Sequence, residues 1–300
     1  LNNQGTPAKN LTMTAVTGDI TFTGSVGGSS SLGTVTVNSA RTINSVAFSA
    51  ESLLLIASVS ATISGNLNLT TSLVVNSGAY NVSILGLVNS VAGATVFNNT
   101  GTLQIGTTAA NLTASTFIGG IEATLPSSVS LNGTITTLDI TDINLGAVAV
   151  VLQSATILNS NNGNITLGGT LNSRNAITQQ PLTLIAGVGD ISFVSAVGSV
   201  FRLGAVTVTS AATVLASSTF TAESFTQTSG SVITTFSDRI NLTRAFDFTG
   251  TALNINGLGA NVVGSNALAG FLFGMNVTNT GLFTTAVGAN LSVGNDFTQD

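Results

Sequence analysis

The chain has 300 residues, of which 43% are hydrophobic and only 6% are charged, and its net charge is −5. This abundance of apolar residues excludes a disordered chain, and the absence of any basic stripe argues against nucleic acid as a partner. The chain contains no cysteine and no histidine, which excludes disulfides, thiolate metal sites and Ser-His-Asp or Cys-His catalysis.

Short alternating segments typical of β-strands follow one another along the chain, and Gly, Asn or Ser flanks each of them. They include residues 20–23, 35–37, 67–70, 81–84, 138–140 and 165–167. No helical pattern separates these segments, and β-branched residues dominate over the Lys, Glu, Arg and Gln that helices favour. No apolar run approaches the roughly 18 residues of a membrane-spanning helix. The sequence therefore predicts an all-β protein with no membrane span.

A long internal repeat organises these segments. Positions 11–37 align with positions 182–208 without a gap, so that Gly18-Asp19-Ile20 recurs as Gly189-Asp190-Ile191. Further on, Ala50-Glu51-Ser52 recurs as Ala222-Glu223-Ser224, after a slip of a single position at a turn. We expect copy one to span about 11–181 and an incomplete copy two about 182–300, as in a piece of a longer array.

The repeat is too long for one solenoid coil, which needs about twenty residues for three short strands. Small insertions that shift the register without destroying the pattern fit a solenoid, where loops bulge outward while strands keep stacking. We therefore predict one continuous parallel β-helix (β-solenoid) over residues 1–300. The 15 phenylalanines are expected to form core rungs, and asparagines are expected to form ladders at turns.

Candidate catalytic groups are few. Asp139 and Asp142 form the one close acidic pair, which we interpret as one turn residue and one exposed strand residue. Lys9, the only lysine, is interpreted as a solvated charge.

The duplicated acids have a different interpretation. Asp19, Asp190, Glu51 and Glu223 recur in equivalent positions, which favours a turn role over a unique active site. No calcium motif is present. We predict no catalytic, cofactor-binding or metal-binding residue and no cofactor. Asn-x-Ser/Thr triplets leave glycosylation open; they include those that begin at Asn10, Asn68, Asn81, Asn111, Asn164, Asn241 and Asn276.

The phrase from Leu182 to Phe193, followed by Val197-Gly198 and Leu203-Gly204-Ala205-Val206-Thr207-Val208-Thr209, resembles repeats of giant bacterial β-strand-repeat surface proteins, which are similar to filamentous-haemagglutinin-type adhesins. The resemblance implies a right-handed parallel β-helix that is secreted to the cell surface and has an adhesive or matrix-forming role without catalysis.

We therefore expect a structural or adhesive protein that associates with further copies of itself, including assembly into a filament, sheath or surface layer. Cell-surface or matrix polysaccharide is a second expected partner. The alternative is a carbohydrate-binding or carbohydrate-cleaving β-helix, which needs acids, Arg and aromatic residues gathered on one face.

Overall fold

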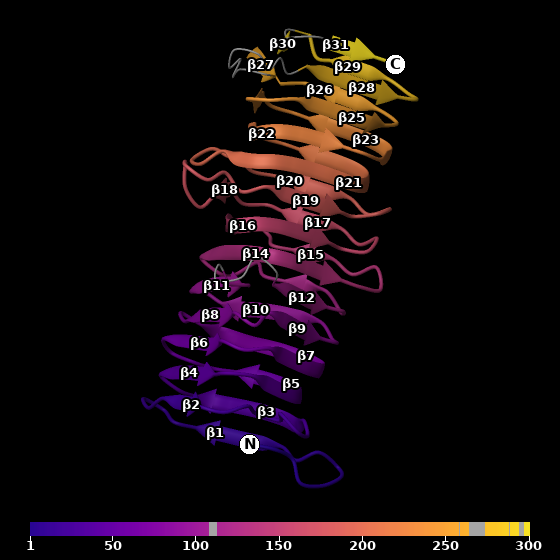
Figure 1. The fold of residues 1–300 in the computed structure, drawn as a ribbon. Helices are drawn as coiled ribbons and strands as arrows, with labels where there is room; N and C mark the ends of the chain where they lie inside the picture. The colour runs from indigo at the N-terminus through magenta and orange to yellow at the C-terminus, as the bar shows by residue number, and fades with distance from the viewer. Residues whose placement is uncertain (108–112, 258, 264–273, 288, 294–296) are drawn as a thin grey trace.

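A computed structural model describes residues 1–107, 113–257, 259–263, 274–287, 289–293 and 297–300. Over these ranges the chain forms 31 strands and no helix, and every strand pairing is parallel. The strands stack as a β-solenoid of about 12 turns that rises from the N-terminus to the C-terminus (Figure 1). The prediction of an all-β parallel solenoid is confirmed. No helix in the described part of the chain is long and apolar enough to cross a membrane.

The strands follow one another in chain order with short connections. Those of the first half are β1 (Leu11–Thr14), β2 (Ile20–Phe22), β3 (Leu32–Ser39), β4 (Thr42–Ser45), β5 (Phe48–Leu55), β6 (Ser60–Ile63), β7 (Leu67–Gly78), β8 (Asn81–Ile84), β9 (Val88–Val91), β10 (Thr95–Asn99), β11 (Thr102–Ile105), β12 (Ala114–Phe117), β13 (Ile121–Glu122), β14 (Ser128–Thr137), β15 (Ile143–Asn144) and β16 (Ala149–Asn159). Those of the second half are β17 (Ile165–Leu167), β18 (Leu171–Ser173), β19 (Leu182–Ile185), β20 (Ile191–Phe193), β21 (Leu203–Ala216), β22 (Phe220–Gln227), β23 (Gly230–Phe236), β24 (Ile240–Leu242), β25 (Phe246–Gly250), β26 (Leu253–Ile255), β27 (Gly259–Val263), β28 (Met275–Asn279), β29 (Phe283–Thr285), β30 (Ala289–Val293) and β31 (Phe297–Gln299).

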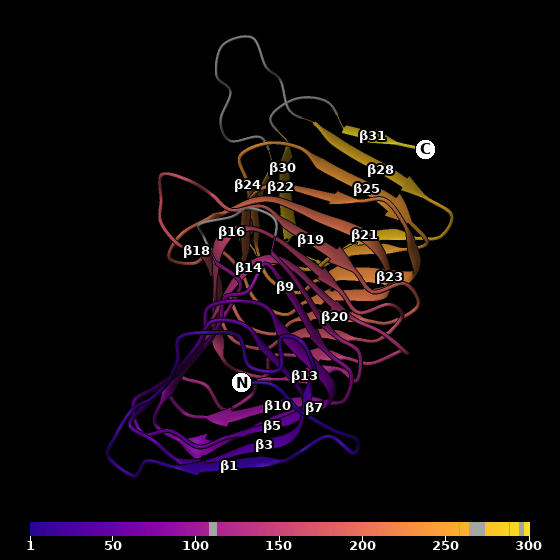
Figure 2. The same ribbon diagram turned by 60° about the horizontal axis from the view of Figure 1, so that its bottom comes forward.

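Each turn contributes to three stacked columns of paired residues, which we call ladders 1, 2 and 3. Ladder 1 contains Leu11, Val35, Leu53, Leu73, Thr95, Ile121, Ile143, Ile165, Ile191, Val214, Thr234, Leu253 and Phe283. Ladder 2 contains Ile20, Ile43, Ala61, Val82, Leu103, Val129, Val150, Leu171, Val197, Phe220 and Ile240. Ladder 3 contains Val26, Phe48, Leu67, Asn89, Ser115, Ile135, Leu158, Leu184, Val208, Gln227, Phe248 and Val277. Figure 2 shows the turns stacked above one another.

The ladder residues face inward, and their apolar members belong to one continuous hydrophobic core, in which ladder 3 also buries the polar residues Asn89, Ser115 and Gln227. Side chains alternate between core and surface along each strand, because successive residues of a strand point to opposite faces. Burial of one Val, Leu, Ile or Phe side chain stabilises the fold by about 1.5–3 kcal/mol. The length of a turn varies along the stack, because loops of different size bulge at the corners. A short turn separates the partners Val35 and Leu53, and a much longer one separates Leu253 and Phe283.

Most phenylalanines occupy the core, as predicted. The buried ones are Phe48, Phe97, Phe117, Phe193, Phe220, Phe225, Phe236, Phe246 and Phe248. Phe22, Phe201 and Phe283 are half-buried. The prediction is wrong for Phe297, which is 44% exposed on the terminal strand. Phe271 and Phe273 lie outside the described residues.

One predicted strand, residues 138–140, is a turn. Asp139 and Ile140 have positive φ angles of 55° and 62°, which is the left-handed conformation and is incompatible with a strand. The alternating pattern of Leu138, Asp139 and Ile140 misleads because Ile140 points into solvent and is 70% exposed.

The sequence repeat is out of phase with the turns of the solenoid. Ile191, the repeat equivalent of Ile20, lies in ladder 1, eight turns above Leu11, whereas Ile20 itself lies in ladder 2. Val197, the equivalent of Val26, lies in ladder 2 instead of ladder 3. Equivalent residues of the two copies are therefore displaced by one ladder, about one third of a turn.

The equivalent corners nevertheless keep the same local geometry. Gly27 and Gly198 have φ angles of 65° and 66°, and a Cβ on either would lie 2.0 Å from a backbone oxygen of the next turn. Those oxygens belong to Ser49 and Thr221, which are themselves repeat equivalents. Both corners require glycine because they combine a left-handed backbone with close stacking.

Candidate functional site

The candidate acids Asp139 and Asp142 both lie in the turn between β14 and β15. The prediction of one turn residue and one exposed strand residue is wrong for Asp139, which was expected in the strand 138–140 and lies in the turn together with Asp142. Asp142 is exposed, and its backbone oxygen accepts a hydrogen bond from the N–H of Ile121 at 3.0 Å. The corner geometry therefore sets the position of both acids.

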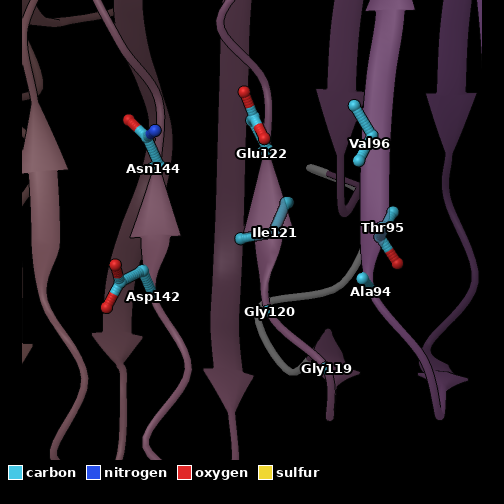
Figure 3. Close-up of a pocket in the computed structure, with 9 residues that line it drawn as sticks. All are labelled: Ala94, Thr95, Val96, Gly119, Gly120, Ile121, Glu122, Asp142 and Asn144. Atoms are coloured by element: carbon cyan, nitrogen blue, oxygen red, sulfur yellow. The ribbon is translucent and has the colours of Figure 1, made fainter.

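A shallow surface notch of about 200 Å³ lies beside Asp142. Its floor is formed by small residues, including Ala94, Gly119 and Gly120, and its polar lining comes from Glu122, Asp142 and Asn144 (Figure 3). Glu122 and Asn144 are register partners on adjacent turns. Gly119 stacks closely on the turn below, since a Cβ at this position would lie 2.3 Å from the backbone nitrogen of Ala94.

The carboxylate of Asp142 has a structural partner. Its Oδ1 accepts a hydrogen bond from the N–H of Asn164 at 2.7 Å. Asn164 Oδ1 accepts in turn from the N–H of Asp190 at 2.9 Å, and Asp190 Oδ1 accepts from the N–H of Thr213 at 3.0 Å. We call this series the Asx ladder. Each side chain accepts from a backbone N–H of the next turn at an exposed corner and so ties successive turns together.

Asp142 is hydrogen-bonded within the Asx ladder, so Glu122 is the one carboxylate of the notch without such a bond. Glycoside hydrolysis uses two carboxyl groups in distinct roles. No group of three or more Asp or Glu residues that could hold a metal ion occurs within the described ranges. The notch is therefore a weak candidate for catalysis.

The duplicated acids occupy equivalent corners. Asp19 accepts a hydrogen bond from the hydroxyl of Thr42 at 2.7 Å and pairs with Arg41. Hydrogen bonds from Thr42 and then Arg41 lower the pKa of Asp19 below its usual value. Asp190 bonds to Thr213, the repeat equivalent of Thr42. Both aspartates therefore bind the first residue of the same segment one turn above.

The duplicated glutamates differ in their partners. Glu223 forms an ion pair with Arg244 at 2.7 Å, and Glu51 is exposed. The repeat position equivalent to Arg244 is Thr71, so the ion pair belongs to copy two alone. Lys9 is exposed just before β1.

Four of the seven asparagines named above make side-chain hydrogen bonds. Asn276 donates through Nδ2 to Asp247 Oδ1 at 2.7 Å. Asn10 and Asn81 each accept a hydrogen bond at Oδ1 from a backbone N–H of the next turn, from Thr34 and Thr102 respectively, and Asn164 does the same in the Asx ladder. Asn111 lies outside the described residues.

The outer face of ladder 2 carries a surface that the sequence analysis missed, which we call the polar strip. On five successive turns its outward residues form two columns, Thr42, Ser60, Asn81, Thr102 and Ser128 beside Asn44, Thr62, Ser83, Gln104 and Ser130. All ten are uncharged hydrogen-bonding residues, and all are exposed or half-buried. The alternation within each strand was visible in the sequence, but the alignment of the five strands required the length of each turn.

The fold places the chain in the class of parallel β-solenoid repeat proteins. Comparison with protein-family models, with curated proteins and with solved structures finds no match for the chain.

Proposed function

We propose that the protein is a non-catalytic extracellular rod with a structural or adhesive role at the cell surface. The observation that carries this proposal is the uninterrupted stack, in which ladder 1 runs through 12 turns from Leu11 to Phe283. At about 4.8 Å per turn the stack is roughly 60 Å long. A rod of this shape can hold two attached groups apart, and it can present similar surface groups repeatedly to one partner.

The internal duplication supports the same role. The two copies share core and corner residues, as with Phe22 and Phe193 or Gly27 and Gly198. Some outward positions are also shared, such as Asn68 and Asn241, whereas others differ; for example, Leu215 replaces Asn44. The duplication thus preserves what stacking requires.

The resemblance of the segment from Leu182 to Thr209 to β-strand-repeat adhesins supports secretion and surface display. Self-association with further copies, as a filament, sheath or layer, is the assembly we propose. The scarcity of charge on the outer faces favours it, because little electrostatic repulsion opposes lateral contact.

Immunogold electron microscopy of the source cells and of their extracellular material tests the proposal. We expect label on fibres or layers outside the cell envelope, with an axial repeat of about 4.8 Å in diffraction. Label confined to the cell interior would contradict the proposed location. Labelled extracellular material without ordered structure would contradict self-assembly and leave adhesion.

A further inference from the structure

We propose that the polar strip is a docking surface for an uncharged, extended β-linked polysaccharide chain that lies along the solenoid axis. This inference rests on the proposed extracellular role and names a partner for it. The residues involved are the ten outward side chains of the strip, from Thr42 and Asn44 at one end to Ser128 and Ser130 at the other.

The charge of the strip selects for an uncharged partner. None of its ten side chains is ionisable, and the adjacent Asp19 and Arg41 neutralise each other in an ion pair. An anionic or cationic polymer would lose hydration on this surface without gaining an opposite charge. A neutral glycan loses only hydroxyl hydration, which hydroxyl and amide groups replace.

Some hydrogen-bonding groups of the strip are free to meet a ligand, whereas Thr42, Asn81 and Ser130 already bond within the protein. Within the described residues, the hydroxyls of Ser60, Thr62 and Ser83 make no hydrogen bond to the protein. Gln104 donates through Nε2 to the oxygen of Gly106 at 3.1 Å, which leaves its Oε1 as an acceptor. Hydroxyls both donate and accept, as sugar hydroxyls do, so the two surfaces are complementary without a fixed orientation.

The spacing of the strip matches a polymer better than a small ligand. Equivalent side chains recur about every 4.8 Å along the axis, and the two columns are separated by two residues, about 6.7 Å. One pyranose ring of an extended β-linked chain has a length comparable with the rise of one turn, so successive rings meet successive turns. The flat face lacks the concave shape of small-molecule sites.

Apolar side chains border the strip at both corners. Val59, just before β6, is 51% exposed, and Leu87, between β8 and β9, is also 51% exposed. Such groups contact the apolar C–H faces of sugar rings, and their burial by a glycan chain adds favourable free energy.

Affinity electrophoresis with two cellulose derivatives of the same backbone tests the proposal. The full chain is run through gels that contain hydroxyethylcellulose, which is uncharged, or carboxymethylcellulose, which is anionic. We expect stronger retardation by hydroxyethylcellulose. The triple variant T62A/S83A/Q104A is expected to bind it at least about tenfold more weakly, because three polar contacts are lost.

The matched control removes three outward hydroxyls from a different face. T183A/T207A/T226A changes register partners on β19, β21 and β22 of ladder 3, and we expect its retardation to equal that of the unchanged chain. Far-UV circular dichroism of both variants verifies the fold.

Three results would overturn the docking proposal: no retardation by hydroxyethylcellulose, equal weakening by the control variant, or stronger retardation by carboxymethylcellulose. Electron microscopy of the unchanged chain separates this inference from the proposed function. Ordered extracellular assemblies of a chain that hydroxyethylcellulose does not retard would refute the docking surface and leave the structural role intact.

Discussion

Two regions of the solenoid share one backbone architecture but differ in what fills them. The phenylalanine-cored turns, residues 193–248, contain six buried rings, Phe193, Phe220, Phe225, Phe236, Phe246 and Phe248. Five of them, all except Phe248, pack with centroids 5.2–5.8 Å apart, mostly edge to face. Such pairs add about 0.5–1.5 kcal/mol each beyond their burial.

The polar-cored turns, residues 76–137, bury hydrogen-bonding groups instead. Asn89 is 1% exposed; its Oδ1 accepts from the N–H of Leu67, and its Nδ2 donates to the oxygen of Gly86 and to Ser115 Oγ. Tyr80 is fully buried and its hydroxyl donates to the backbone oxygens of Leu55 and Asn76.

The comparison shows that stacked backbone hydrogen bonding fixes the shape of the solenoid, while its core accepts either packed phenylalanine rings or hydrogen-bonded polar side chains. Ring packing is adaptable, whereas a buried amide stabilises only when its donors and acceptors are satisfied. Thr95 Oγ1, Asn99 Oδ1 and Asn132 Nδ2 are buried without a hydrogen-bond partner among the described residues, against Arg202 Nε alone in the phenylalanine-cored turns, so the polar-cored turns carry the larger cost. We expect amide hydrogen exchange to be faster in the polar-cored turns.

The largest effect is expected in the phenylalanine-cored turns. Phe225→Ala removes a ring that contacts Phe220, Phe236 and Phe246, which should lower the free energy of unfolding by about 3–5 kcal/mol because a cavity remains. Urea denaturation measures this change. Thr226→Ala, on the outer face next to it, is the control, and an equal effect of both would contradict the assignment of Phe225 to the core.

In the polar-cored turns, Asn89→Ala should cost about 1–3 kcal/mol, because the N–H of Leu67 loses its acceptor inside the core. The same denaturation assay applies. Asn68→Ala, at an exposed position of β7, should change stability little. A neutral Asn89→Ala would show that water replaces the amide without penalty.

Tyr80→Phe replaces a buried polar side chain with a phenylalanine ring. The loss of the hydroxyl should lower the free energy of unfolding by about 0.5–1.5 kcal/mol. Burial raises the pKa of Tyr80. The folded state therefore keeps the phenol proton above the usual tyrosine pKa of about 10 while the unfolded chain releases it, so stability should fall as pH rises beyond about 10.

Because Tyr80 is the only tyrosine, its phenolate absorbance reports this titration directly. We expect the absorbance to rise together with unfolding, and the Tyr80→Phe variant to lose less stability in alkali. Ionisation of Tyr80 at about pH 10 in the intact fold, the usual tyrosine value, would contradict its burial.

The smallest effect is expected at the surface. Hydrogen bonds from Thr42 and Arg41 lower the pKa of Asp19, so its contribution is present above the unfolded pKa and is lost as pH falls through the lower folded pKa. Thermal unfolding between pH 5 and pH 2, about the usual aspartate range, should show less acid sensitivity in Asp19→Asn. Asp190→Asn serves as the comparison, since Ala212 stands where copy one has Arg41.

The apolar ladders were predictable from sequence because Val, Ile, Leu and Phe alternate with polar residues in most strands. The polar interior was not, because Asn89 inside and Asn81 outside are the same residue type, and only the register distinguishes them. The polar strip and the phase shift were hidden for a related reason. Turns as unequal as those that begin at Val35 and at Leu253 prevent a count along the chain from locating the face on which a residue lies.

Disulfide cross-linking tests the stacking and its phase most directly, since the chain has no native cysteine. The structure pairs Thr166 with Ser192 on adjacent turns and places Thr183 in ladder 3. Oxidation should therefore link T166C/S192C, because paired residues lie about 4.8 Å apart, and should leave T166C/T183C unlinked. The reverse result would place the two copies in phase and contradict the register of the solenoid.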